Sequence, residues 1–141
     1  MLTHSRRNLI TQRWLIALIM LIGLLGHSCV ATKNEQGPTS LLQANAEEAL
    51  QAEQFDRAEM LLERAMRVEP RNPENWHLMG RVRFGQHRYA QAVQFCLKSN
   101  SLVGKNATLG KQNWILIEKA YTAMGETQKA AEIRRNYLER P

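Results

Sequence analysis

Two stretches of the 141-residue chain repeat one another at an offset of 34 residues, and the matched positions keep the same kind of side chain. Small residues match small ones, rings match rings and apolar residues match apolar ones, in the pairs Ala46/Gly80, Phe55/Tyr89, Ala58/Ala92, Leu62/Cys96, Ala65/Ser99 and Pro70/Gly104. A repeat of this length is typical of stacked helical units, in which each unit buries its apolar face against the next. The period therefore predicts an all-α array of helical hairpins.

The spacing of apolar residues within the first repeat is also helical. Apolar side chains recur every three or four residues on both sides of a turn that contains Gln54, Phe55 and Asp56. Asp56 is a candidate cap for the second helix, because aspartate accepts hydrogen bonds from the free backbone N–H groups of a first turn. That helix is expected to end at Glu69, since Pro70 and Pro73 disfavour its continuation.

The second repeat carries the most specific motif. Trp76, Gly80, Tyr89 and Ala92 resemble the signature of the tetratricopeptide repeat, a helical hairpin of about 34 residues. The resemblance implies a right-handed α-solenoid of about three repeats in residues 39–141. We expect the repeats at about 39–72, 73–106 and 111–141.

The third copy is looser. It shows matching residues at Trp114, Tyr121, Gly125 and Ala130. Four extra residues fit near 106–109, either in the linker or as a longer first turn of the next helix. Glu118 stands where the family has a small residue, which puts close helix packing in doubt at that point.

The N-terminus resembles an export signal over residues 1–28. Arginines precede an apolar run at 14–25, which is shorter than the ~20 residues that a spanning helix needs. Cys29 follows a small residue directly after this run, as in the motif that directs lipid attachment in bacterial lipoproteins. The resemblance implies a lipid on Cys29, a flexible tether over 29–38 and, with Val30 next, sorting to the outer membrane facing the periplasm.

Three other interpretations of the N-terminus stay open. Cleavage after Ala31 would release a soluble periplasmic protein, and an uncleaved signal would anchor the chain in the inner membrane. Residues 5–10 also resemble a twin-arginine signal.

Charge is distributed unevenly along the chain. The formal net charge is +6; residues 30–70 hold 4 basic and 8 acidic side chains, and residues 71–141 hold 12 basic and 5 acidic ones. This asymmetry either steers a charged partner or reflects ordinary solvated helix faces. The sequence has no basic run and no alternation of aromatic and basic residues, which argues against nucleic-acid binding.

The sequence offers no catalytic constellation, no metal-ligand spacing and no cofactor motif. His77 and His87 are interpreted as surface or partly packed histidines, and Cys96 as a buried structural thiol. We therefore expect a non-enzymatic protein without cofactors.

The family resemblance implies a binding groove lined by the first helix of each hairpin. The corresponding positions here are Gln43, Glu47, Leu50, Glu74, His77, Arg81, Phe84, Gln112, Ile115, Lys119 and Thr122. Among them the candidate partner contacts are Gln43, Glu47, His77, Arg81, Phe84, Ile115 and Lys119. Phe84 and Ile115 would offer apolar contacts, and Arg81 and Lys119 would bind acidic groups. The alternative is that these are ordinary solvated side chains, and the basic clamp for a peptide carboxylate that some members carry is absent.

These features predict a membrane-tethered adaptor of the bacterial envelope that holds a protein or peptide partner in the periplasm. Assembly of a pilus, a secretion system or another envelope complex would be such a role, by analogy alone. The alternatives are a membrane-anchored element that forms homo-oligomers and an accessory regulator of an envelope enzyme.

Overall fold

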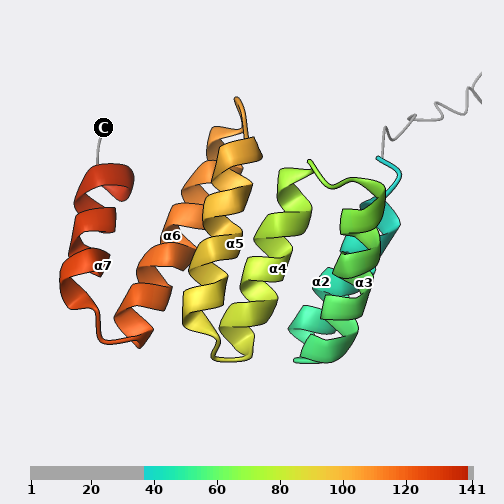
Figure 1. Ribbon diagram of the computed structural model, residues 1–141, viewed down its shortest axis with the longest axis horizontal. Helices are drawn as coiled ribbons and strands as arrows, with labels where there is room; N and C mark the ends of the chain where they lie inside the picture. The colour runs from blue at the N-terminus through green and yellow to red at the C-terminus, as the bar shows by residue number, and fades with distance from the viewer. Residues whose placement is uncertain (1–36, 140–141) are drawn as a thin grey trace, which may run out of the picture. The chain divides into compact units, whose positions relative to one another are not determined.

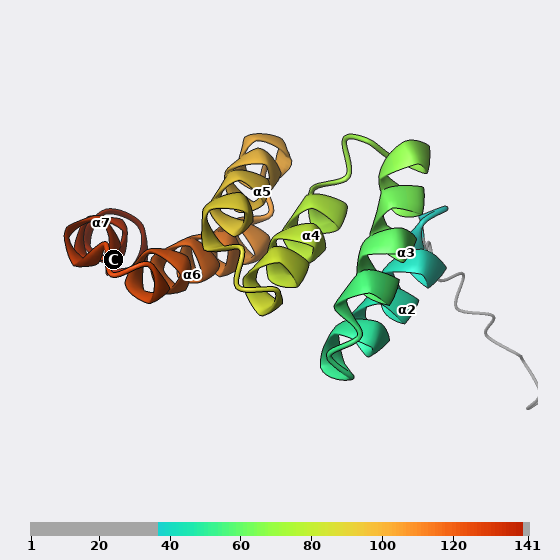
Figure 2. The ribbon, with the colours of Figure 1, turned by 60° about the horizontal axis from the view of Figure 1, so that its bottom comes forward.

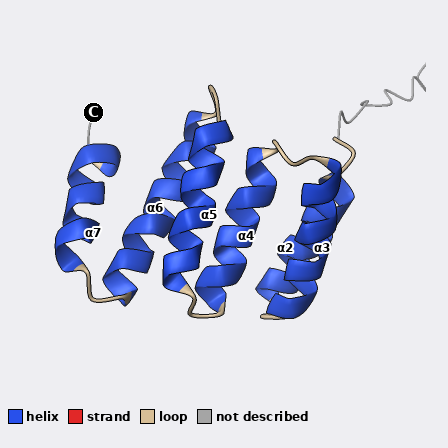
Figure 3. Cartoon of the chain, in the orientation of Figure 1, coloured by secondary structure: helices blue, strands red, loops and turns tan. Residues whose placement is uncertain are grey.

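The computed structural model describes residues 37–139, and helices make up nearly all of this part (Figures 1 and 3). Within it, six α-helices follow one another: α2 (Ser40–Gln51), α3 (Phe55–Val68), α4 (Pro73–Gly85), α5 (Tyr89–Leu102), α6 (Ala107–Ala123) and α7 (Thr127–Ile133). A π-helical segment, η1 (Arg134–Leu138), continues α7. The predicted export signal, Cys29 and most of the tether lie outside the described residues. No helix within 37–139 has both the length and the apolar character needed to cross a bilayer.

The helices pair as three hairpins, α2 with α3, α4 with α5 and α6 with α7. Each hairpin also contacts the next, through α3 with α4 and through α5 with α6. The first helices of the hairpins contact one another along the stack, α2 with α4 and α4 with α6, whereas α3 and α5 do not touch. Figure 2 shows α5 beside α6 and α3 beside α2, with α4 between these two pairs. The predicted all-α array of hairpins is confirmed.

The helix ends follow local chemistry. The helix α3 ends at Val68, one residue before the expected Glu69 and ahead of Pro70. Asp56 does not cap it: Gln54 occupies the cap position without a side-chain bond, and Asp56 lies in the first turn. The helix α4 has the stronger start, because Asn72 Oδ1 accepts a 3.0 Å hydrogen bond from the backbone N–H of Glu74.

The four extra residues of the third repeat lengthen a helix. The helix α6 has 17 residues, against 12 and 13 in α2 and α4. Asn106 caps it by accepting a 3.1 Å hydrogen bond from the backbone N–H of Leu109. The insertion therefore forms an extended first turn.

Glycines on α4 bring this helix close to both of its neighbours. A Cβ on Gly80 would lie 2.7 Å from Cys96 Sγ of α5, and a Cβ on Gly85 would lie 2.2 Å from Cε1 of Phe55 of α3. Neither space admits a methyl group without movement of the neighbour. The small residues of the repeat thus set the spacing between α4 and the two helices beside it.

The other small residues of the repeat are buried too. Ala46, Ala58 and Ala92 are fully buried, and Ala130 is nearly so. Cys96 is buried too, and burial raises the pKa of its thiol to about 12, so it remains a neutral packing group. The interpretation of Cys96 as a structural thiol is confirmed.

The contacts that stabilise the third hairpin differ from those of the first two. Glu118 of α6, at the position where the family has a small residue, forms an ion pair with Arg134 of η1. Trp114 stacks on Tyr137, with ring centroids 3.7 Å apart and an interplanar angle of 12°. A polar pair and an aromatic stack therefore join α6 to η1.

Replacing Gly80 with alanine tests the close approach of α4 to α5. We expect a loss of about 1–3 kcal/mol in the free energy of unfolding, because the added methyl group must displace the Cys96 thiol. The double variant Gly80→Ala/Cys96→Ala should be more stable than the two single effects predict when added, since it removes the clash. Urea unfolding measures each variant.

The matched control is Gly110→Ala in α6, where the nearest atom to a new Cβ is 3.7 Å away. This substitution should stabilise the chain by about 0.5–1 kcal/mol, the usual difference between alanine and glycine in a helix. Equal effects at Gly80 and Gly110 would contradict the proposed close packing.

Candidate functional site

A pocket of about 360 Å³ opens on the side of the stack formed by the first helices of the hairpins. Its wall comes from α2, α4 and α6, which lie beside one another (Figure 2). The lining residues are Glu47, Glu74, His77, Arg81, Gln112, Ile115, Leu116 and Lys119. One helix from each repeat thus contributes to a single mixed polar and apolar surface, called here the α2–α4–α6 pocket.

The structure brings together five of the seven candidate contacts, namely Glu47, His77, Arg81, Ile115 and Lys119. The other two lie elsewhere. Gln43 donates a 2.8 Å hydrogen bond to Asn75 Oδ1, so it joins α2 to α4. Phe84 packs against the core between the second and third hairpins, with its ring 5.3 Å from that of Tyr89.

An ion pair between neighbouring repeats engages one of the two basic residues of the pocket. Arg81 Nη1 lies 3.0 Å from Glu47 Oε1, and these residues occupy the same place in successive repeats. Lys119 is the third member of this series, and it forms no ion pair with any residue in 37–139. The cation available to an acidic partner is therefore Lys119, while Arg81 is engaged with Glu47.

Comparison with known proteins agrees with the fold of helical hairpins. A sequence profile of the tetratricopeptide repeat matches residues 49–99. Among solved structures, the chain is similar to the globular C-terminal domain of P. aeruginosa LpoP, with 29% sequence identity and a TM-score of 0.68. The similarity covers 72% of this chain and 95% of that domain. Residues 37–139 have the tetratricopeptide-repeat fold. No curated protein matches the chain.

Behind the pocket, a buried hydrogen-bond network joins the second and third hairpins of the tetratricopeptide-repeat domain. The Ser99 hydroxyl donates to the carbonyl oxygen of Pro73 at 2.8 Å. Because that carbonyl can only accept, Ser99 Oγ accepts from Asn113 Nδ2, also at 2.8 Å. The remaining amide oxygen of Asn113 then accepts from His77 Nδ1 at 2.7 Å.

This network fixes the tautomer of His77. With its proton on Nδ1, the neutral ring keeps a lone pair on Nε2. The side chain is only 7% exposed, and burial lowers the pKa of His77. His77 is therefore neutral near pH 7, and its position on the pocket wall is held by α5 and α6 as well as by α4.

Glu74 is the second acid of the pocket besides Glu47. Burial, followed by the nearby charge of Glu47, raises the pKa of the Glu74 carboxyl. The carboxyl groups of Glu47 and Glu74 line the same pocket as the basic side chains Arg81 and Lys119. The pocket therefore carries both signs of charge.

Leu116 also lines the pocket wall, although the family resemblance did not mark it as a groove position. Leu116 follows Ile115 directly, and helical spacing alone places successive residues on different sides of a helix. Its contribution depends on the exact rotation of α6 against α4, for which the sequence holds no signal. No group of three or more His, Cys, Asp or Glu side chains within residues 37–139 is arranged to hold a metal ion.

The state of His77 makes the stability of the domain depend on pH. Because folding lowers the pKa of His77, the unfolded chain takes up this proton first as the pH falls. The free energy of unfolding should therefore decrease as the pH falls below about 6.5, the ordinary value for histidine. Denaturant unfolding at a series of pH values measures this slope.

The control is His77→Gln, which keeps a donor for Asn113 but cannot titrate. Glu74 has a raised pKa and acts in the opposite direction at lower pH, but it is present in both proteins and cancels in the difference. An unchanged pH slope in His77→Gln would show that His77 is not the group responsible.

Proposed function

We propose that the chain is a non-enzymatic adaptor that holds a segment of a partner protein in the α2–α4–α6 pocket. The observation that carries this proposal is the convergence of one helix from each repeat on a single open pocket with apolar, basic and acidic positions. Such a surface offers contacts for recognition, and it provides neither a nucleophile with an adjacent base nor a metal cluster among the described residues.

The arrangement of the side chains indicates how a partner would bind. Ile115 is 37% exposed and, with Leu116 beside it, forms the apolar part of the pocket. Lys119 lies one helical turn further along α6 and is exposed, so it can meet a carboxylate next to an apolar side chain. His77 Nε2 and Glu74 offer acceptors for backbone N–H groups of an extended peptide.

The envelope location rests on the N-terminal segment and is supported by the comparison. The apolar run and Cys29 fit a lipid-anchored exported protein, with the domain joined to the membrane by a short tether. The similar structure is the globular C-terminal domain of a bacterial protein, and the domain of this chain also follows an N-terminal segment. We propose that a lipid on Cys29 holds the domain at the outer membrane, facing the periplasm.

The pocket proposal predicts the loss of a specific partner when the surface is altered. Ile115→Asp/Lys119→Glu should reduce capture of the partner, after crosslinking in cells, by about tenfold or more, because it removes the apolar contact and reverses the available charge. Both side chains are exposed, so the domain should fold normally. Quantitative mass spectrometry of captured proteins gives the measurement.

The matched control is Lys111→Glu, which makes the same charge reversal as Lys119→Glu at an exposed position of α6 outside the pocket. It should leave capture unchanged. If the double variant keeps every partner of the wild type, the pocket is not the binding surface.

Lipid attachment predicts that cells incorporate radiolabelled palmitate into the chain and that Cys29→Ser abolishes this labelling. The same variant should shift the protein from the membrane to the soluble periplasmic fraction or leave its signal uncleaved. Labelling that survives Cys29→Ser would rule out this anchor. The other cysteine, Cys96, is buried in the domain, so Cys96→Ser should keep its label.

A further inference from the structure

The side of the stack opposite the α2–α4–α6 pocket carries a second concavity. The helices α3 and α5 have no close backbone contact with each other, and α4 lies between them (Figure 1). The resulting space, called here the α3–α5 furrow, has a volume of about 430 Å³. Its apolar lining consists of Met66, Pro70, Trp76, Met79 and Phe95.

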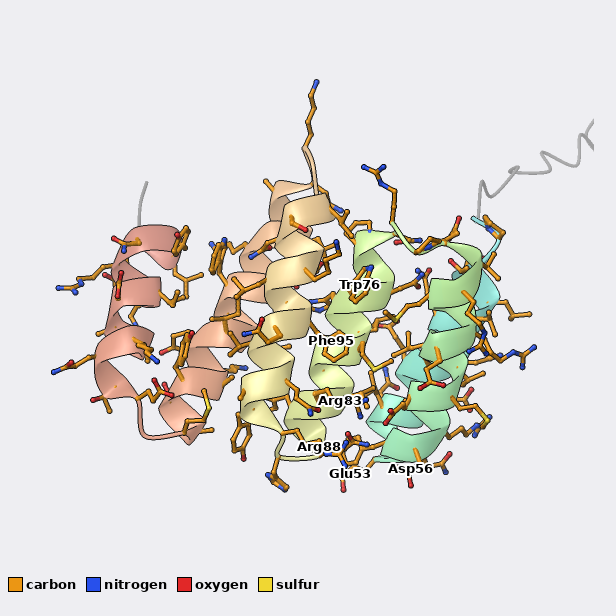
Figure 4. The ribbon with its side chains drawn as sticks, viewed as in Figure 1. Glu53, Asp56, Trp76, Arg83, Arg88 and Phe95 are labelled. Carbon is orange, nitrogen blue, oxygen red and sulfur yellow. The ribbon has the colours of Figure 1, made fainter. Side chains whose placement is uncertain are left out.

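The floor of the furrow is a column of stacked groups, visible in Figure 4 as Trp76, Phe95 and Arg83. The rings of Trp76 and Phe95 stack with centroids 5.9 Å apart and an interplanar angle of 30°. Arg83 Cζ lies 5.9 Å from the centroid of Phe95, and Lys98 Nζ lies 5.7 Å from that of Trp76. The column therefore runs from one cation through two rings to another cation.

Hydrogen bonds fix this column in place. Trp76 Nε1 donates to the carbonyl oxygen of Pro70 at 2.8 Å. Arg83 donates to both carboxylate oxygens of Glu59 at 2.6 Å, and these bonds hold the pKa of Glu59 below its ordinary value. The aromatic surface is thus ordered before any partner arrives, which reduces the entropic cost of binding.

The charges at the Trp76 end of the furrow are predominantly positive and unpaired. Arg67 and Lys98 are both exposed, and neither forms an ion pair within the described part of the chain. Arg83 is neutralised by Glu59, and Glu63 is the one acidic residue among the lining side chains. A partner with carboxylates beside its apolar contact would complement this end.

We propose that the α3–α5 furrow is a second docking site, for a partner-protein segment that presents an aromatic side chain flanked by acidic residues. The aromatic side chain packs against Trp76 and Phe95, and the carboxylates reach Arg67 and Lys98. This site goes beyond the proposed function, which uses the other side of the stack, and neither depends on the other. With both sites the domain would bridge two protein segments.

Nuclear magnetic resonance of the full ¹⁵N-labelled chain tests this proposal through its tryptophan indoles. The probe is a short capped peptide with one phenylalanine between pairs of glutamates. It should shift the indole resonance of Trp76 and leave that of Trp114 unchanged, because Trp114 is covered by Tyr137 in another hairpin. A matched peptide with lysines in place of the glutamates should bind about tenfold more weakly or worse.

The charge-reversal variant Arg67→Glu/Lys98→Glu should weaken binding of the glutamate peptide by about tenfold or more, while Lys119→Glu in the other pocket should have no effect. Both altered residues are exposed, and the dispersion of the indole signals reports that the domain remains folded. The proposal is overturned if Trp76 does not respond, if Trp76 and Trp114 respond equally, or if charge reversal leaves the affinity unchanged. A shift of Trp76 with protein concentration alone would assign the furrow to a second copy of the chain instead.

Discussion

The close approach of α4 to its two neighbours is the constraint on which the rest of the domain depends. Gly80 leaves room for the thiol of Cys96, and Gly85 leaves room for the ring of Phe55, so one helix is fitted against both α5 and α3. Since α4 also contacts α2 and α6, its position sets the spacing of all three first helices. Both candidate surfaces are built on this helix: His77 and Arg81 face the pocket, and Trp76 and Arg83 face the furrow.

The repeat predicts the architecture well because it preserves the sizes of side chains, and the close packing of the helices depends directly on those sizes. Ala58 and Ala92 are small in the sequence and fully buried in the structure. The period also places Glu47 and Arg81 at equivalent positions of adjacent helices, which is why they meet as an ion pair. Asp56 shows the limit of local reasoning, since a good capping residue does not cap when the cap position lies two residues before it, at Gln54.

The site was less predictable than the fold, because its details depend on contacts distant in sequence. Phe84 lies three residues after Arg81 on α4, where helical geometry places it at the border between groove and core. Partial burial of its ring beside Tyr89, against the core between the second and third hairpins, decides the outcome. His77 belongs to a network that needs Asn113, 36 residues away, and Ser99 of the helix between them. The repeat period of the sequence does not predict such a network.

The partner is proposed to lie in the α2–α4–α6 pocket, and crosslinking from a single position of that pocket tests this most directly. A photoreactive amino acid placed at Ile115 in living cells should give a crosslinked product with a discrete partner. The same amino acid at Leu41, which is 72% exposed but outside the pocket, should give none. Crosslinking at Leu41 but not at Ile115 would contradict the account.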